Sequence, residues 1–162
     1  MASVIRRCDY RALNVDVPQI ALNFQLDVAE EQGKRVCHAE SLMTMQYKAG
    51  VTEREDLVLN AELTDLLEPP KIDGATLTSE QYIQDAAAET LIIRASAFPE
   101  PSSSATFTLS TRNKLLPENN LQFQGLYCTS GIFCTQMEAE GYRRMVPSFD
   151  RPDVCCIKST VL

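Results

Sequence analysis

The stretch Ile20-Ala21-Leu22-Asn23-Phe24-Gln25-Leu26-Asp27-Val28 places a large apolar side chain at every second position. Successive side chains of an extended chain point to opposite faces, so this pattern predicts a strand with one face in a core and the other in solvent. Turn-forming residues follow at Gln32-Gly33-Lys34. A second run, Arg35 to Tyr47, then places Cys37, Ala39, Met43, Met45 and Tyr47 on one side. The two runs together predict a β-hairpin.

Three further short runs, rich in Leu, Ile or Thr, are typical of strands: Asp56 to Asn60, Thr90 to Ala95 and Thr106 to Thr111. The segment Ser79 to Glu89 instead favours one or two helical turns, because Gln, Ala and Glu tolerate a helix and a serine can cap its start. No long amphipathic helix and no strand-helix-strand alternation is visible. We therefore predict an all-β fold, an antiparallel β-sandwich or saddle-like sheet.

Length and charge restrict the function classes. A chain of 162 residues suits one domain, which we assign to residues 1–162. The net charge of -7 opposes binding to nucleic acid or to an anionic membrane surface, so neither is an expected partner. No apolar run is long enough for a secretory signal or a membrane span, which leads us to expect a cytoplasmic protein.

The six cysteines, Cys8, Cys37, Cys128, Cys134, Cys155 and Cys156, form no Cys-x-x-Cys pair. Reduced, structural thiols are therefore the expected state, with a Cys128 to Cys134 bridge across a hairpin as the alternative in an oxidising compartment. The single histidine, His38, lies in a predicted strand and is interpreted as an ordinary strand residue.

The last third of the chain carries a more specific pattern. Its blocks are Gly125-Leu126-Tyr127, then Cys134-Thr135-Gln136-Met137-Glu138-Ala139-Glu140-Gly141, then Asp150-Arg151-Pro152-Asp153. Asp9-Tyr10-Arg11-Ala12 and Leu57-Val58-Leu59-Asn60 add to it nearer the start. In this order and spacing the blocks resemble the aminopeptidase N family of zinc metallopeptidases, in particular its alanyl aminopeptidase branch. Departures are Met137 in place of cysteine, Gln124 in place of glutamate, and Pro147-Ser148 in place of an aromatic-rich stretch.

The resemblance implies an amino-terminal β domain that lies beside a thermolysin-like catalytic domain and lends it Gln136 and Glu138. These two residues would hold the free α-amino group of a peptide, because an amide oxygen and a carboxylate accept hydrogen bonds from an ammonium group. Met137 alternates with them and would point the other way. Glu140 is expected to satisfy local groups such as Arg143.

The resemblance also implies zinc in the full-length family enzyme, held by a His-Glu-x-x-His motif and a later glutamate. That motif and the Gly-Ala-Met-Glu-Asn exopeptidase motif are both absent from this sequence, so no cofactor is expected in this chain itself. We expect a chain truncated before the catalytic domain, with an incomplete last strand at Leu162, inactive alone and self-associating through an uncovered interface. The alternative is a non-catalytic module from a truncated gene copy that binds peptide termini or a partner domain.

Overall fold

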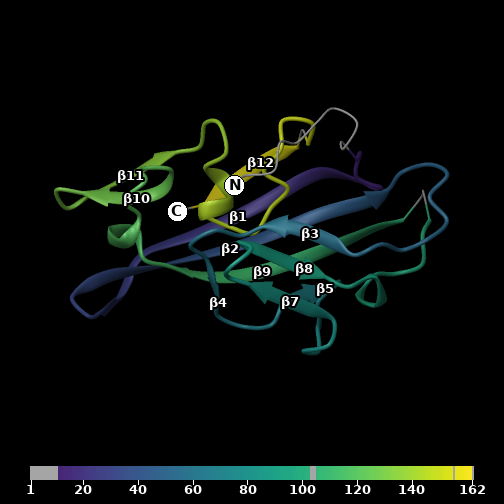
Figure 1. The fold of residues 1–162 in the computed structure, drawn as a ribbon, viewed down its shortest axis with the longest axis horizontal. Coiled ribbons are helices and arrows are strands. Elements are labelled where there is room, and N and C mark those ends of the chain that lie inside the picture. Colours follow the sequence, from purple (N-terminus) through teal and green to yellow (C-terminus); the bar gives the residue numbers. More distant parts are fainter. Residues whose placement is uncertain (1–10, 103–104, 155, 162) are drawn as a thin grey trace.

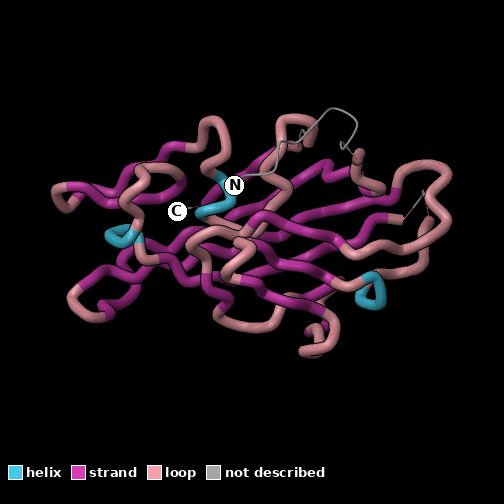
Figure 2. Tube along the Cα trace, viewed as in Figure 1, coloured by secondary structure: helices cyan, strands magenta, loops and turns pink. Residues whose placement is uncertain are grey.

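The computed structural model describes residues 11–102, 105–154 and 156–161, and these ranges contain strands and short 3-10 turns but no α-helix. The strands form three sheets of seven, three and two strands, so the predicted all-β class is confirmed (Figures 1 and 2). No helix in the described ranges is long and apolar enough to cross a membrane.

The seven-stranded sheet is built on the predicted hairpin, β1 (Val15–Glu31) with β2 (Lys34–Tyr47). Its order is β12-β1-β2-β9-β5-β6, and β4 pairs with β9 off this path. The additional members are β9 (Thr106–Leu115), β5 (Lys71–Ile72), β6 (Ala75–Thr76), β4 (Asp65–Leu66) and β12 (Ile157–Val161). All neighbours are antiparallel except β12, which runs parallel to β1 at one edge.

A second layer covers one face of this sheet. It is the three-stranded sheet β3 (Leu57–Asn60), β8 (Thr90–Ile93) and β7 (Tyr82–Asp85), in the order β3-β8-β7. One apolar cluster joins the layers: Met43, Met45 and Leu109 come from the large sheet, and Leu59, Leu91 and Ile93 from the small one. Each of these six side chains is almost completely buried. The sandwich thus rests on the alternation that the sequence predicts for β2, whose five predicted inward residues are all buried.

The end of β1 corrects the predicted pattern. Leu26 and Val28 belong to the apolar face by alternation, yet both are exposed. The pairing shifts register here, since Gln25 pairs with His38 whereas the next pair is Ala29 with Val36. β1 therefore uses four residue steps where β2 uses two, and Asp27 takes a positive φ of 55° within this irregularity. A bulge of this kind bends a strand and interrupts its alternation.

The helical interpretation of Ser79 to Glu89 is wrong. Residues 82–85 form β7, which pairs with β8 through Tyr82–Ile93 and Asp85–Thr90. The following turn is closed by Asp85, whose Oδ1 accepts hydrogen bonds from the backbone N–H groups of Ala87 and Ala88 at 3.0 and 2.9 Å. Strand pairing and this side-chain turn satisfy the backbone that a helix would otherwise use.

Candidate functional site

The predicted site residues lie at the end of a separate hairpin, β10 (Gly125–Thr129) with β11 (Ile132–Gln136). Its two-residue turn is Ser130-Gly131, with φ angles of 49° and 80°. Positive φ at both central positions is the backbone of a type I′ turn, whose twist matches that of paired strands. The register then places Gly125 opposite Gln136 at the base of the hairpin.

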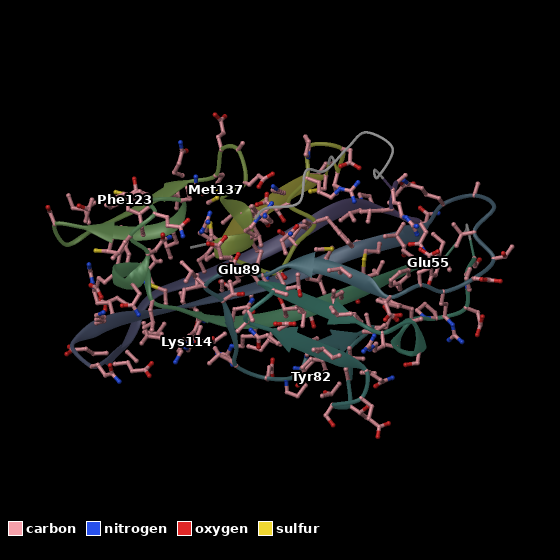
Figure 3. All side chains as sticks on the ribbon, in the orientation of Figure 1. Glu55, Tyr82, Glu89, Lys114, Phe123 and Met137 are labelled. Atoms are coloured by element: carbon pink, nitrogen blue, oxygen red, sulfur yellow. The ribbon has the colours of Figure 1, made fainter. Side chains whose placement is uncertain are left out.

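The exposure of Gln136, Met137 and Glu138 alternates, although only Gln136 of the three belongs to a strand. Gln136, the last residue of β11, and Glu138, in the following turn, are exposed. Met137, which is labelled in Figure 3, is half-buried and packs against the main core. Within the described ranges, neither the Gln136 amide nor the Glu138 carboxylate has a hydrogen-bond or ion-pair partner in the protein. Two acceptors that lie two residues apart are therefore exposed to solvent.

Two glycines fix the turn that presents Glu138. Gly141 N–H donates a hydrogen bond to the carbonyl of Met137 at 2.9 Å, which closes the turn. A Cβ on Gly141 would lie 2.3 Å from the carbonyl oxygen of Gln136, and one on Gly125 would lie 2.6 Å from Cβ of Arg144. Gly125 also has a φ of +72°, in the region that favours glycine. The backbone at the base of the hairpin can approach this closely only because both residues lack a side chain.

Glu140 differs from Glu138 in having a local partner. Its Oε2 lies 3.2 Å from Nη2 of Arg143, as the sequence analysis expected. Arg143 in turn pairs through Nε with Oδ2 of Asp150 at 3.0 Å and donates from Nη2 to the Asp150 carbonyl at 3.0 Å. The two glutamates of this turn therefore differ. Glu140 forms an ion pair with Arg143 in the segment that follows, and Glu138 has no such partner in the described ranges.

A buried arginine, missed by the sequence analysis, ties the base of the hairpin to the sandwich. Nη2 of Arg144 lies 2.6 Å from Oε1 of Glu62, which follows β3, and both side chains are buried. Further bonds reach the amide oxygens of Gln122, at 2.7 Å, and Gln124, at 2.5 Å. Glu62 and Arg144 are 82 residues apart, so no local sequence signal identifies the pair.

An apolar cavity of about 450 Å³ lies beneath this segment, between β1, β12 and the hairpin. Phe24, Leu126, Met137 and Tyr142 contribute to its lining. Lys158 from β12 lies at its border with Nζ 3.9 Å from the centre of the Tyr142 ring. Burial raises the pKa of Tyr142, and the nearby Cys156 and Asp150 act in the same direction, so its phenol stays protonated.

The described residues do not form a zinc site. In the described part of the chain no group of three or more His, Cys, Asp or Glu side chains could hold a metal ion. His38 lies in the middle of β2, where burial and then the charge of Arg112 lower its pKa. A zinc ion bound in the manner of a metallopeptidase would need further ligands around it.

The register of the β10–β11 hairpin argues against a disulfide between Cys128 and Cys134. Cys128 pairs with Phe133 and Cys134 pairs with Tyr127, so the two thiols point to opposite faces and both are free. Cys37 is buried, and burial raises the pKa of its thiol. Cys8 and Cys155 lie outside the described residues, as do Asp9 and Tyr10 of the opening motif.

Comparisons with known proteins agree with this architecture. The family model of the peptidase M1 N-terminal domain matches residues 17–160. Aminopeptidase N of Escherichia coli is 32% identical over 148 residues, which cover 91% of this chain and 15% of that protein. The chain therefore spans about one seventh of the length of this relative.

Solved structures give the same result. Aminopeptidase A of Legionella pneumophila, determined in complex with aspartic acid, superimposes with a TM-score of 0.76 at 25% identity over 94% of this chain and 16% of that one. An M1 zinc metallopeptidase of Deinococcus radiodurans shares the fold with a TM-score of 0.67 at 16% identity, over 91% of this chain and 32% of that one.

Proposed function

We propose that this chain, which belongs to the peptidase M1 N-terminal domain family, binds the free α-amino group of a peptide through Gln136 and Glu138. It would do so as part of a zinc aminopeptidase that removes N-terminal amino acids. The zinc ion and the general base would come from sequence outside these 162 residues, since the described residues offer no metal site.

The observation that carries the proposal is the contrast between Glu138 and Glu140. An anchor for an ammonium group must keep its acceptor free until substrate arrives. Glu138 meets this requirement because it is exposed and has no partner in the described ranges, whereas Glu140 is paired with Arg143. Gln136 adds a second exposed acceptor, and Met137 anchors the segment between them to the core.

The central test restores a catalytic domain by fusing the chain to the matching downstream part of the Escherichia coli relative. Glu138→Ala should remove hydrogen bonds between a carboxylate and an ammonium group, which contribute about 1.5–3 kcal/mol. The expected result is a fall in kcat/KM of roughly 10- to 150-fold on a substrate with a free amino terminus. Gln136→Ala should cost less, because it removes a neutral acceptor.

Glu140→Ala is the matched control, since it removes a carboxylate from the same turn that already has a protein partner. It should act through stability or have little effect on kcat/KM. Zinc content and the unfolding temperature of every variant separate recognition from loss of fold. Unchanged kinetics in a stable Glu138→Ala fusion would refute the assignment of the amino-group anchor.

The same proposal makes a statement about the chain alone. The purified 162 residues should bind no stoichiometric zinc and hydrolyse no amino-acid arylamide, because ligands and general base are supplied elsewhere. Metal analysis and an arylamide assay, with host aminopeptidase excluded, measure both. Zinc-dependent turnover that persists through purification would contradict it.

A further inference from the structure

Arg35 lies at the start of β2, beside the tip of the long β1–β2 hairpin, and it reaches a part of the chain more than eighty residues away. Its Nε lies 2.8 Å from Oε1 of Glu118, and its backbone N–H donates to Oε2 of the same carboxylate at 2.6 Å. Glu118 belongs to the 3-10 turn η3 (Pro117–Asn119), which leads from β9 toward β10. The neighbouring Lys34 also bonds to Asn119 in this turn.

The same guanidinium extends beyond Glu118 to the β10–β11 hairpin. Nη1 donates to the carbonyl of Gly131 in the hairpin turn at 3.0 Å. The guanidinium carbon lies 4.3 Å from the centre of the Phe133 ring, and Nη2 contacts Sγ of Cys128. Cys128 and Phe133 form a cross-strand pair, so one arginine contacts the turn and one face of both strands. A planar, multiply donating cation is suited to such a bridging position.

Besides Arg35, the far half of the hairpin is held by Phe133, which packs against the main core. The hairpin pairs with no strand of the other sheets, and a two-stranded hairpin alone is only marginally stable in water. Its base is packed, since Gly125 and Leu126 are buried, but the residues around the turn are exposed or half-exposed. Figure 1 shows the hairpin beside the far end of β1 and β2, with the short turn η3 between them.

We propose that Arg35 is a positioning residue, which with Glu118 holds the far half of the β10–β11 hairpin against the tip of the β1–β2 hairpin and so fixes how β11 presents Gln136 and Glu138. The clamp itself is independent of any ligand. Its consequence for substrate rests on the proposed function above.

Charge supports the clamp at neutral pH. The hydrogen bond to Glu118 raises the pKa of Arg35, and the hydrogen bonds from Arg35 lower the pKa of Glu118, so both partners are ionised. Lys34 adds a positive charge near Glu118, and Asp27 adds a negative one near Arg35.

Hydrogen exchange on the full 162-residue chain tests the clamp directly. Arg35→Met keeps the length of the side chain but removes every donor. Amides of residues 126–135 should exchange roughly 3- to 10-fold faster, whereas amides shared by β2 and β9 around Met43 and Leu109 should keep their rates. Arg94→Met is the matched control, since Arg94 pairs with Asp56 at 2.6 Å away from the hairpin, and it should leave residues 126–135 unchanged.

Two further variants keep the test decisive. Glu118→Gln removes the charge but retains an acceptor, so it should accelerate the same amides by less, and it replaces Arg35→Met if that variant does not fold. Arg35→Lys restores the charge without the planar fork and should fall between wild type and Arg35→Met. Wild-type exchange in the hairpin of Arg35→Met, or equal acceleration of hairpin and main sheet, would overturn the clamp.

The link to substrate is tested in the fusion enzyme. Arg35→Met should raise KM several-fold, and this effect should disappear in a Glu138→Ala background, because a mispositioned anchor matters only where the anchor is present. An unchanged KM in Arg35→Met would overturn the positioning role. If Glu138→Ala alone has no effect, the proposed function fails, while the exchange experiment still decides the clamp.

Discussion

Two arginines hold the β10–β11 hairpin from opposite ends, and they do so in different environments. Arg144 at the base and its partner Glu62 are 8% and 7% exposed. Arg35 near the turn and its partner Glu118 are 25% and 27% exposed. The first pair lies inside the protein and is joined by two glutamine side chains, whereas the second is in contact with solvent.

The two ion pairs should therefore differ in their contribution to the stability of the domain. A buried ion pair gains little over an apolar replacement, but loss of one partner leaves an uncompensated buried charge. A solvent-exposed pair is screened and contributes little to global stability. The base of the hairpin should therefore break with the whole domain, and the turn should loosen by itself.

The largest effect is expected from Arg144→Met. This change strands the Glu62 carboxylate, which is buried within the protein, and should lower the free energy of unfolding by about 3–5 kcal/mol. Urea unfolding followed by circular dichroism measures it. The double variant Glu62→Gln with Arg144→Met should recover part of the loss, because the stranded charge is then gone. If Arg144→Met is as stable as wild type, the Arg144–Glu62 pair contributes as little to global stability as the exposed Arg35–Glu118 pair.

Gly141→Ala should have the next largest effect. The new methyl group would lie 2.3 Å from the carbonyl oxygen of Gln136 and 2.9 Å from the nitrogen of Gly125, so backbone must move. We expect a loss of about 1–3 kcal/mol in unfolding free energy. Ala139→Ser, an exposed change in the same turn, should stay within about 0.5 kcal/mol. Equal stability of the two variants would show that the glycine contact does not constrain the turn.

The smallest effect concerns pH and the outer pair. The pKa of Glu118 is lowered in the folded protein, chiefly by Arg35, so its contribution is present above the unfolded value of about 4.5 and is lost as pH falls through the folded value. Protection of hairpin amides, corrected for intrinsic exchange, should therefore decrease below about pH 4.5 while the main sheet stays protected. Glu118→Gln should remove the part of this pH dependence that is specific to the hairpin. A pH response that is identical in wild type and Glu118→Gln would assign it to other carboxylates.

Alternation was sufficient to predict the β1–β2 hairpin of the large sheet. Features that depend on residues distant in the chain were missed. The inward residues of β2 follow from period two, because one face of that strand packs on a core throughout. The exposure of Leu26 and Val28 does not, since it depends on a register shift that only the partner strand defines. At Ser79 to Glu89, local helix propensity was overridden by pairing with β8.

The site divides in the same way. Gln136 and Glu138 were predicted as site residues because they lie in one short sequence block, and Met137 between them packs against the core. Arg35 and Arg144 were not found, since their partners lie 83 and 82 residues away and no local pattern marks such pairs. The residues proposed to bind substrate were thus visible in the sequence, and the arginines that hold the hairpin were not.

The irregularity in β1 limits which changes of length this domain can accept. Between Gln25 and Ala29, β1 contains two more residues than the matching part of β2. Because this excess is even, side chains of β1 keep the same faces relative to β2 on both sides of the irregularity. Deleting one of residues 26–28 would reverse the faces of Ala29, Glu30 and Glu31 relative to β2. Deleting two would keep the faces and remove the bend that shapes the hairpin tip carrying Arg35. Insertions and deletions in this segment should therefore be tolerated in pairs and rejected singly.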